Sequence, residues 1–180
     1  GAVGLPCCVL SCGGVLTVAT MSKIERGLMA PTYDRFAGLA NGLGVDVAAL
    51  FSSAGNAFEV GTVAVARAEK FDFLQAENYT YQMLFTETHN KSMTPMIGVL
   101  QPRTNSDSDR MFRHPGQEFL MVLAGMLVIE FEDKDDVLLE TGDSIYFDCG
   151  QGHRYQPRGG EEVRAVVVIT PSCPEDVQHG

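Results

Sequence analysis

The residues of this chain best suited to chemistry are two histidines and a glutamate. His114 and Glu118 lie four residues apart in a His-Pro-Gly-Gln-Glu stretch, and His153 follows much later. Two imidazoles and one carboxylate on one face of a metal ion leave coordination positions open, as in non-haem Fe(II) oxygenases. The same ligands can hold zinc with a water in the fourth position. The sequence therefore predicts a divalent metal site, provided that the fold brings the three side chains together.

The chain around these residues is typical of short antiparallel strands. Residues 118–132 are strongly apolar and interrupted by Gly125, and turns rich in Gly and Asp separate the runs that follow. The other candidate strands are residues 64–68, 79–86, 96–100, 137–139, 144–147 and 163–170. The run at 79–86 alternates in part, which is typical of a sheet with one face in water. This pattern predicts an all-β half-chain that surrounds a pocket.

The glycines and the candidate ligands fall into two recognisable motifs. The pattern His114-x3-Glu118-x6-Gly125 resembles the second half of the first cupin motif, and residues 142–153 resemble the second cupin motif. The resemblance implies a cupin-type β-barrel (a double-stranded β-helix) in which His114, Glu118 and His153 are metal ligands. It also implies Fe, Zn or Ni as the divalent metal.

The chain departs from the cupin pattern at three positions. Phe112 stands where the family usually has a further His, and Asp148 and Pro157 stand where the second motif usually has Pro and Asn. The alternative interpretation is that the site has decayed and that His114 and His153 only line an organic pocket.

Other polar residues lie near the expected mouth of the pocket. The candidate ligand-binding residues are Arg113, Gln151, Arg154 and Tyr155. An anionic or amino-acid-like ligand needs donors of these kinds. Each of them has the alternative interpretation of a solvated residue at the rim.

A second resemblance lies near the start of the chain. Residues 17–27, Pro31-Thr32 and residues 36–51 look like the later half of a helix-turn-helix of the lambda-repressor-like (XRE) class. Helical spacing of apolar residues supports helices at 21–28 and 36–43, with Gly27 ending the first, and Asp46 is suited to cap a short third helix.

In that class, the first of these helices is the recognition helix, which lies in the major groove of DNA. The resemblance implies DNA-binding roles for Thr17, Thr20, Ser22, Lys23 and Arg26. The alternative is a small helical cap with ordinary polar surface residues. The module is apparently incomplete at its front, because the class has two further helices before this one. The sixteen residues before Thr17 carry no charge and no amphipathic period.

The apolar start is not typical of a targeting signal. It lacks a basic n-region, and it is shorter than a membrane span. Five cysteines without a paired-motif spacing fit a reducing compartment. The sequence therefore predicts a cytoplasmic protein with no membrane association, and it places Cys149 beside the pocket.

These patterns predict an α+β protein in two parts. Residues 1–51 are the helix-turn-helix-like segment with atypical or missing first helices, 52–62 a linker, 63–172 a cupin β-barrel sensor domain and 173–180 a tail. The formal net charge is −10, and most of the acidic residues lie in the β half. This acidity counts against non-specific binding of nucleic acid but leaves room for a localised DNA-reading segment.

Two functions are compatible with the motifs. The first is a transcriptional regulator whose partners are DNA and a small-molecule effector, bound in the cupin pocket with or without help from a metal. Such regulators work as homodimers on half-sites about one helical turn apart, and we expect pairing through the cupin domain. The alternative is a mononuclear non-haem iron enzyme, oxygenase- or epoxidase-like, with a helical scaffold domain.

Overall fold

The computed structural model describes residues 33–43, 47–50, 55–68, 71–75, 79–102 and 110–170. The predicted recognition helix and its five DNA-binding candidates lie outside these ranges, as do residues 103–109. So do Cys7, Cys8, Cys12 and the predicted tail.

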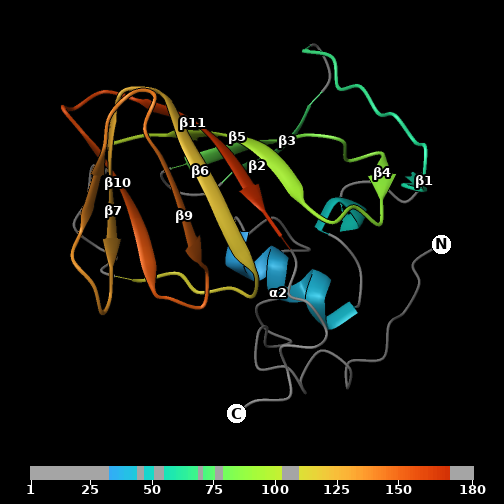
Figure 1. Ribbon diagram of the computed structural model, residues 1–180, viewed down its shortest axis with the longest axis horizontal. Coiled ribbons are helices and arrows are strands. Elements are labelled where there is room, and N and C mark those ends of the chain that lie inside the picture. Colours follow the sequence, from blue (N-terminus) through green and yellow to red (C-terminus); the bar gives the residue numbers. More distant parts are fainter. Residues whose placement is uncertain are drawn as a thin grey trace.

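Two short helices open the described part of the chain. The α-helix α2 (Tyr33–Leu43) and the 3-10 helix η1 (Val47–Leu50) lie where the sequence predicts the second and third helices. Tyr33, Ala40 and Val47 are buried and share one hydrophobic core with the β part, and Phe36 and Ala37 pack against it. The helices therefore pack onto the barrel, at the lower side of the sheet in Figure 1.

Two antiparallel sheets form the rest of the molecule (Figure 1). The larger has the strand order β2-β3-β5-β11-β6-β9, and the smaller has the order β10-β7-β8. Their bounds are β2 (Asp72–Gln75), β3 (Tyr79–Met83), β5 (Thr94–Leu100), β6 (Gln117–Ala124), β7 (Met126–Phe131), β8 (Val137–Leu139), β9 (Ser144–Asp148), β10 (His153–Arg158) and β11 (Val163–Ile169). A parallel pair, β1 (Asn56–Ala57) with β4 (Thr88–His89), lies beside them. The cupin-like, mostly β fold predicted from the sequence is confirmed.

Strand alternation determines which side chains face the interior. Strands β3, β5, β10 and β11 bury every second residue. Along β6 the buried positions are Glu118, Leu120 and Val122. Because Glu118 shares this inward face with apolar residues, its carboxylate lies inside the barrel rather than at the surface.

Gly125 is required at the turn between β6 and β7. Its φ is 90°, in the left-handed region, and an added Cβ would lie 3.0 Å from the Val163 side chain and 3.1 Å from the Glu162 carbonyl oxygen. The motif glycine therefore allows the tight turn that brings β7 back along β6.

The strand prediction for residues 64–68 is wrong. They form no strand, and β2, which has no counterpart among the predicted strands, follows them. Within residues 52–62, β1 pairs with β4. In the described part of the chain, no helix is long and apolar enough to cross a membrane.

Candidate metal centre

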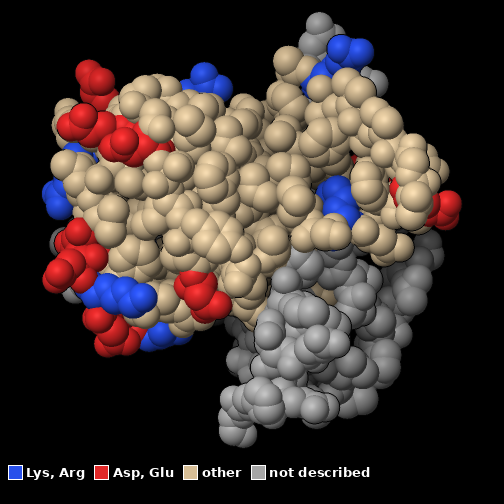
Figure 2. Space-filling model, viewed as in Figure 1, with Lys and Arg blue, Asp and Glu red and all other residues tan. Residues whose placement is uncertain are grey.

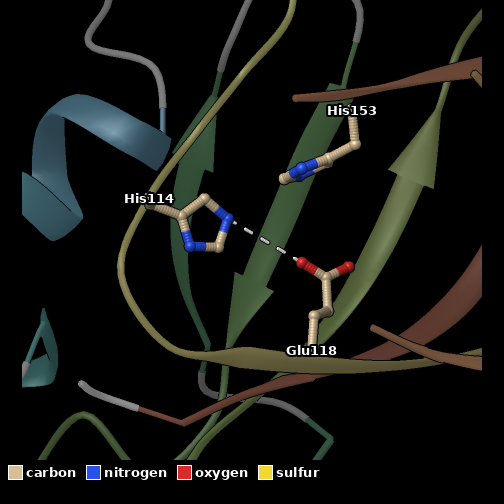
Figure 3. Close-up of side chains that lie close together, drawn as sticks. All are labelled: His114, Glu118 and His153. Carbon is tan, nitrogen blue, oxygen red and sulfur yellow. Dashed lines mark ion pairs between the residues drawn. The ribbon is translucent and has the colours of Figure 1, made fainter. Parts of the chain in front are cut away.

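The three predicted ligands come together inside the barrel (Figure 3). His114 lies on the loop before β6, Glu118 on β6 and His153 at the start of β10. Their side chains offer ligand atoms that all lie within 4.8 Å of one another, and Nε2 of His114 is 3.9 Å from Oε2 of Glu118. The exposed fractions are 6 %, 0 % and 2 %, respectively. The triad is therefore a buried cluster and not a surface patch.

A short backbone pairing places the two histidines side by side. The amide of Phe112 donates to the carbonyl of His153 at 2.9 Å, and the amide of His153 donates back at 3.1 Å. The next inward-facing residue after Phe112 is His114, whose ring lies 5.4 Å from that of His153, centroid to centroid. Phe112 thus helps to hold the loop of His114 through its backbone, although its side chain cannot bind a metal.

Carbonyl contacts orient both imidazole rings. Nδ1 of His153 lies 2.9 Å from the Gln151 carbonyl oxygen, and Nδ1 of His114 lies 3.4 Å from that of Pro115. A carbonyl oxygen only accepts hydrogen bonds, so these contacts favour the tautomer with the proton on Nδ1. The lone pair of each ring is then on Nε2, which is the arrangement that metal-binding histidines have.

Glu118 is the least stabilised member of the triad. The Tyr155 hydroxyl donates a hydrogen bond to Oε1, whereas Oε2 has no hydrogen-bond partner among the described residues. Burial raises the pKa of this carboxyl to about 8, although the Tyr155 hydrogen bond works in the opposite direction. A buried carboxylate oxygen without a donor is unfavourable, and a cation would remove that cost. The nitrogen and oxygen donors of the triad suit zinc, iron or nickel, so the residues present fit a divalent metal.

Aromatic side chains form most of the wall around the triad. They are Tyr33, Tyr79, Tyr81, Tyr155 and Phe112, and Ile169 completes the lining. The cavity is small, with a volume of about 20 Å³. Burial and the charge of Glu118 raise the pKa of Tyr81 and Tyr155 well above the ordinary value, so both hydroxyls stay protonated. The space suits an ion with a water molecule and does not suit a larger ligand without rearrangement.

Tyr33 connects helix α2 directly to the triad. Its ring lies 5.3 Å from that of His114 at an interplanar angle of 70°, and 5.8 Å from that of Tyr81. Its backbone amide donates to the Tyr79 hydroxyl at 3.3 Å. Figure 3 shows the helix on the His114 side of the site. Sequence reasoning missed this residue, because no local pattern reports a contact between a helix and a distant strand.

The four predicted ligand-binding residues divide into two groups. Tyr155 lies inside, under Glu118, and the Gln151 carbonyl holds His153. Arg113 forms an ion pair with Glu132 and donates to the Gly150 carbonyl at 3.1 Å, and Arg154 forms an ion pair with Glu130. Strand alternation predicts that Arg154 points outwards and Tyr155 inwards, because neighbouring residues on β10 face opposite sides of the sheet.

Cys149 supports the site through its backbone. Its carbonyl accepts from the His114 amide at 3.1 Å, and its amide donates to the Gly116 carbonyl at 3.0 Å. The thiol is free and buried, and burial raises its pKa above the ordinary value for cysteine. The thiolate, which is the reactive form, is therefore disfavoured.

Comparisons with known proteins agree with this geometry. Residues 97–169 match the family model of the cupin domain. The (S)-2-hydroxypropylphosphonic acid epoxidase of Streptomyces wedmorensis is 27 % identical over 163 residues, which cover 85 % of this chain and 80 % of the relative.

Two kinds of solved structure share the fold. A crystal structure of Fe(II) HppE is 23 % identical, with a TM-score of 0.53 and coverage of 92 % of this chain and 90 % of the other. An HTH_3 family transcriptional regulator from Vibrio cholerae is 22 % identical, with a TM-score of 0.59 and coverage of 93 % and 88 %. The chain thus contains a cupin domain in an architecture common to an iron protein and a regulator.

Proposed function

We propose that this cupin-containing chain is a transcriptional regulator that couples occupancy of the triad to DNA binding. The observation that carries the proposal is the contact of Tyr33, the first residue of α2, with His114. In this proposal Thr17, Thr20, Ser22, Lys23 and Arg26 contact DNA, and the protein is a cytoplasmic homodimer that pairs through its cupin domain. The resemblance to helix-turn-helix proteins and the fold shared with the Vibrio cholerae regulator support it.

The metal would be held by Nε2 of both histidines and by Oε2 of Glu118. When bound, it would supply a positive charge and open coordination positions for an oxygen of the effector. Tyr155 keeps Oε1 occupied, so Glu118 has one oxygen left for the metal. Gln151, which lies next to His153, is a candidate contact for the effector.

The same geometry suggests how the signal reaches the helices. A ligand larger than a water molecule does not fit the present cavity, so its entry must displace part of the aromatic wall. Displacing Tyr33 moves the start of α2, which directly follows the predicted recognition helix in the chain. Coupling free energies between two such sites are typically about 1–3 kcal/mol, which corresponds to about 5- to 150-fold in affinity.

The first test is a charge-removal variant of the predicted recognition helix. We expect Lys23→Ala/Arg26→Ala to weaken binding to operator fragments, selected from a random DNA library, by at least about tenfold, because phosphate and base contacts are lost. A matched control is Lys134→Ala/Arg158→Ala, which removes the same charge from exposed positions of the β half. Equal DNA affinities of the two variants would refute the assigned role of the helix.

The second test addresses the coupling itself. Operator affinity is measured for the metal-free and zinc-loaded protein, and again for Tyr33→Ala. We expect the two wild-type affinities to differ by at least about fivefold and the difference to shrink in the variant. An unchanged ratio in Tyr33→Ala would show that α2 does not transmit the signal.

A second candidate function is a mononuclear iron enzyme. The observation that favours it is the 27 % identity to the epoxidase over most of this chain. Oxygen consumption by the Fe(II)-loaded protein with (S)-2-hydroxypropylphosphonic acid, lost in Glu118→Ala, would support it. The pairing of Arg113 and Arg154 with acidic residues counts against this substrate, because a phosphonate needs cationic partners.

A further inference from the structure

The triad presents three hydrogen-bond acceptors to one small volume (Figure 3). Nε2 of His114 and Nε2 of His153 carry lone pairs in the tautomer that their carbonyl contacts favour. Oε2 of Glu118 is buried and has no hydrogen-bond donor among the described residues. A metal ion satisfies such a set of acceptors, and so does a cationic group that carries three N–H donors.

The spacing of the acceptors lies between the values for these two kinds of cation. Nε2 of His114 and Oε2 of Glu118 are 3.9 Å apart. Ligand atoms about 2.1 Å from a tetrahedral zinc ion are about 3.4 Å apart. Acceptors about 2.8 Å from an ammonium nitrogen are about 4.6 Å apart. Side-chain movements of less than about 1 Å therefore bring the pair to either arrangement.

The wall of the cavity suits an organic cation. Four tyrosine rings and the ring of Phe112 line it, and Ile169 completes it. Aromatic faces attract ammonium groups, and cages of such rings bind amines in other proteins. Glu118 supplies the negative charge, and no arginine or lysine of the described chain pairs with it. The cavity of about 20 Å³ holds a headgroup about as large as a water molecule.

We propose that the triad of the metal-free protein binds the ammonium group of a small primary amine. Its three N–H groups donate to Nε2 of His114, Nε2 of His153 and Oε2 of Glu118. A primary amine is favoured over a quaternary ammonium because only the primary amine has a donor for each acceptor. The amine and a metal ion are then alternative occupants of one site, because both use the same three atoms.

The inference rests on the proposed function in one respect, namely that the triad is the ligand site. An amine larger than the cavity displaces part of the aromatic wall when it binds. Tyr33 belongs to that wall and begins helix α2, so amine binding produces the movement that the proposed coupling needs. Amine binding itself is measured without DNA.

The test is a titration of the metal-free full chain with methylamine, followed by NMR spectra of the histidine rings. At about pH 9, Glu118 is ionised, the imidazoles are neutral and a primary amine is still protonated. We expect the signals of His114 and His153 to shift saturably with a Kd of about 10 mM, near the limit for a ligand of two heavy atoms. The signal of His89, which lies on β4 outside the triad, should stay in place and report that the protein is folded.

Three controls make the titration specific. Methanol has the same number of heavy atoms but no charge, and it should cause no saturable shift. Glu118→Gln should weaken methylamine binding by at least about tenfold, because the charge-assisted hydrogen bond is lost. Glu140→Gln, which removes the same charge from an exposed position, should bind methylamine like the wild type. One equivalent of zinc should abolish the methylamine shifts.

Three results would overturn the proposal. One is the absence of a saturable shift in the metal-free wild type, and another is an equal response to methanol. The third is an unchanged methylamine affinity in Glu118→Gln. Zinc binding, measured on the same samples, separates this failure from failure of the proposed function. Zinc binding without methylamine binding leaves the triad as a metal site, whereas loss of both refutes the triad as a ligand site.

Discussion

Carboxylates occupy two contrasting regions of this barrel. Glu118 is fully buried on β6, with a pKa raised to about 8 by burial and with no hydrogen-bond donor to Oε2 among the described residues. Glu130 and Glu132, one strand later, form ion pairs with Arg154 and Arg113 at the outside of the smaller sheet. Figure 2 shows that charged side chains gather around the edges of this view and leave its middle largely uncharged.

The different surroundings of Glu118 and of the outer carboxylates indicate different roles. The outer carboxylates have arginine partners, and the exposed pair of Glu132 with Arg113 contributes little to the free energy of unfolding. Glu118 has no arginine or lysine partner in the described structure and lies only 3.9 Å from Nε2 of His114, and in the metal-free protein its burial disfavours the charged form. A residue that is unfavourable on its own and well oriented among two imidazoles is suited to binding a cation.

The largest expected effect comes from removing the buried charge. Glu118→Gln should abolish stoichiometric binding of zinc or iron, because the only anionic ligand of the triad is lost. At pH 9, where Glu118 is ionised, it should also stabilise the metal-free protein by about 1 kcal/mol or more, because a buried charge is removed. Elemental analysis and thermal unfolding of the metal-free samples measure the two effects. Retained metal would show that Glu118 is not a required ligand. A lower Tm of the metal-free variant would show that the buried carboxylate does not destabilise the fold.

The next effect is the pH dependence of metal binding. A metal binds the ionised carboxylate, so below pH 8 it must displace the proton of Glu118. Zinc affinity should therefore rise about tenfold per pH unit from this group alone and level off above pH 8. Calorimetry in two buffers of different ionisation enthalpy should find about one proton released per metal at pH 7. The absence of proton release would show that Glu118 is already ionised.

The same raised pKa affects the stability of the metal-free protein. Glu118 contributes stability that is fully present below its ordinary pKa of 4.5 and is lost as the pH rises through about 8. The free energy of unfolding of the metal-free wild type should fall over this window relative to that of Glu118→Gln. Denaturant titrations of both proteins at pH 5 and pH 8 compare them directly.

A smaller effect is expected from the hydrogen bond behind Glu118. Tyr155→Phe leaves all three ligands in place but frees Oε1. Loss of such an outer contact to a metal ligand typically costs about 10- to 100-fold in affinity. The pKa of Glu118 should rise, because the Tyr155 hydrogen bond lowers it. Zinc affinity against pH tests both expectations, and an unchanged affinity would mean that Tyr155 only fills space.

The smallest effect belongs to the outer carboxylates. Glu132→Gln removes the partner of Arg113, and because both side chains are more than 40 % exposed, the free energy of unfolding should change by about 1 kcal/mol or less. Metal affinity should be unchanged. A large loss of metal in this variant would mean that the pair of Glu132 and Arg113 holds the loop of His114 in place.

The sequence predicts the barrel well because its signals are local. Gly125 and Gly142 lie at turns with φ of 90° and 96°, where other residues are strained. The apolar runs before, between and after these glycines become β6 to β9, and alternation directs Glu118 inwards. The gathering of the triad follows from these turns together with the spacing of the two motifs.

The remainder depends on long-range contacts that leave no local pattern. Nothing near Tyr33 in sequence reports that it packs on His114. Nothing near residues 64–68 reports that this strand-like pattern pairs with no strand in the described part of the chain. Tyr155 could have been placed correctly, since it lies two residues after His153 and shares its inward face. The DNA-binding residues lie outside the described part of the chain, so their roles stay predictions.

The burial of Tyr33 also affects how long a ligand stays bound at the triad. With 5 % of its surface exposed, Tyr33 cannot move aside unless the start of α2 moves with it. An ion or effector bound at the triad must wait for that movement of the wall before it leaves. Residence time would then be governed by helix opening, as in proteins whose lids limit release. Such a protein would respond slowly to a falling ligand concentration and retain its bound state after the signal has gone.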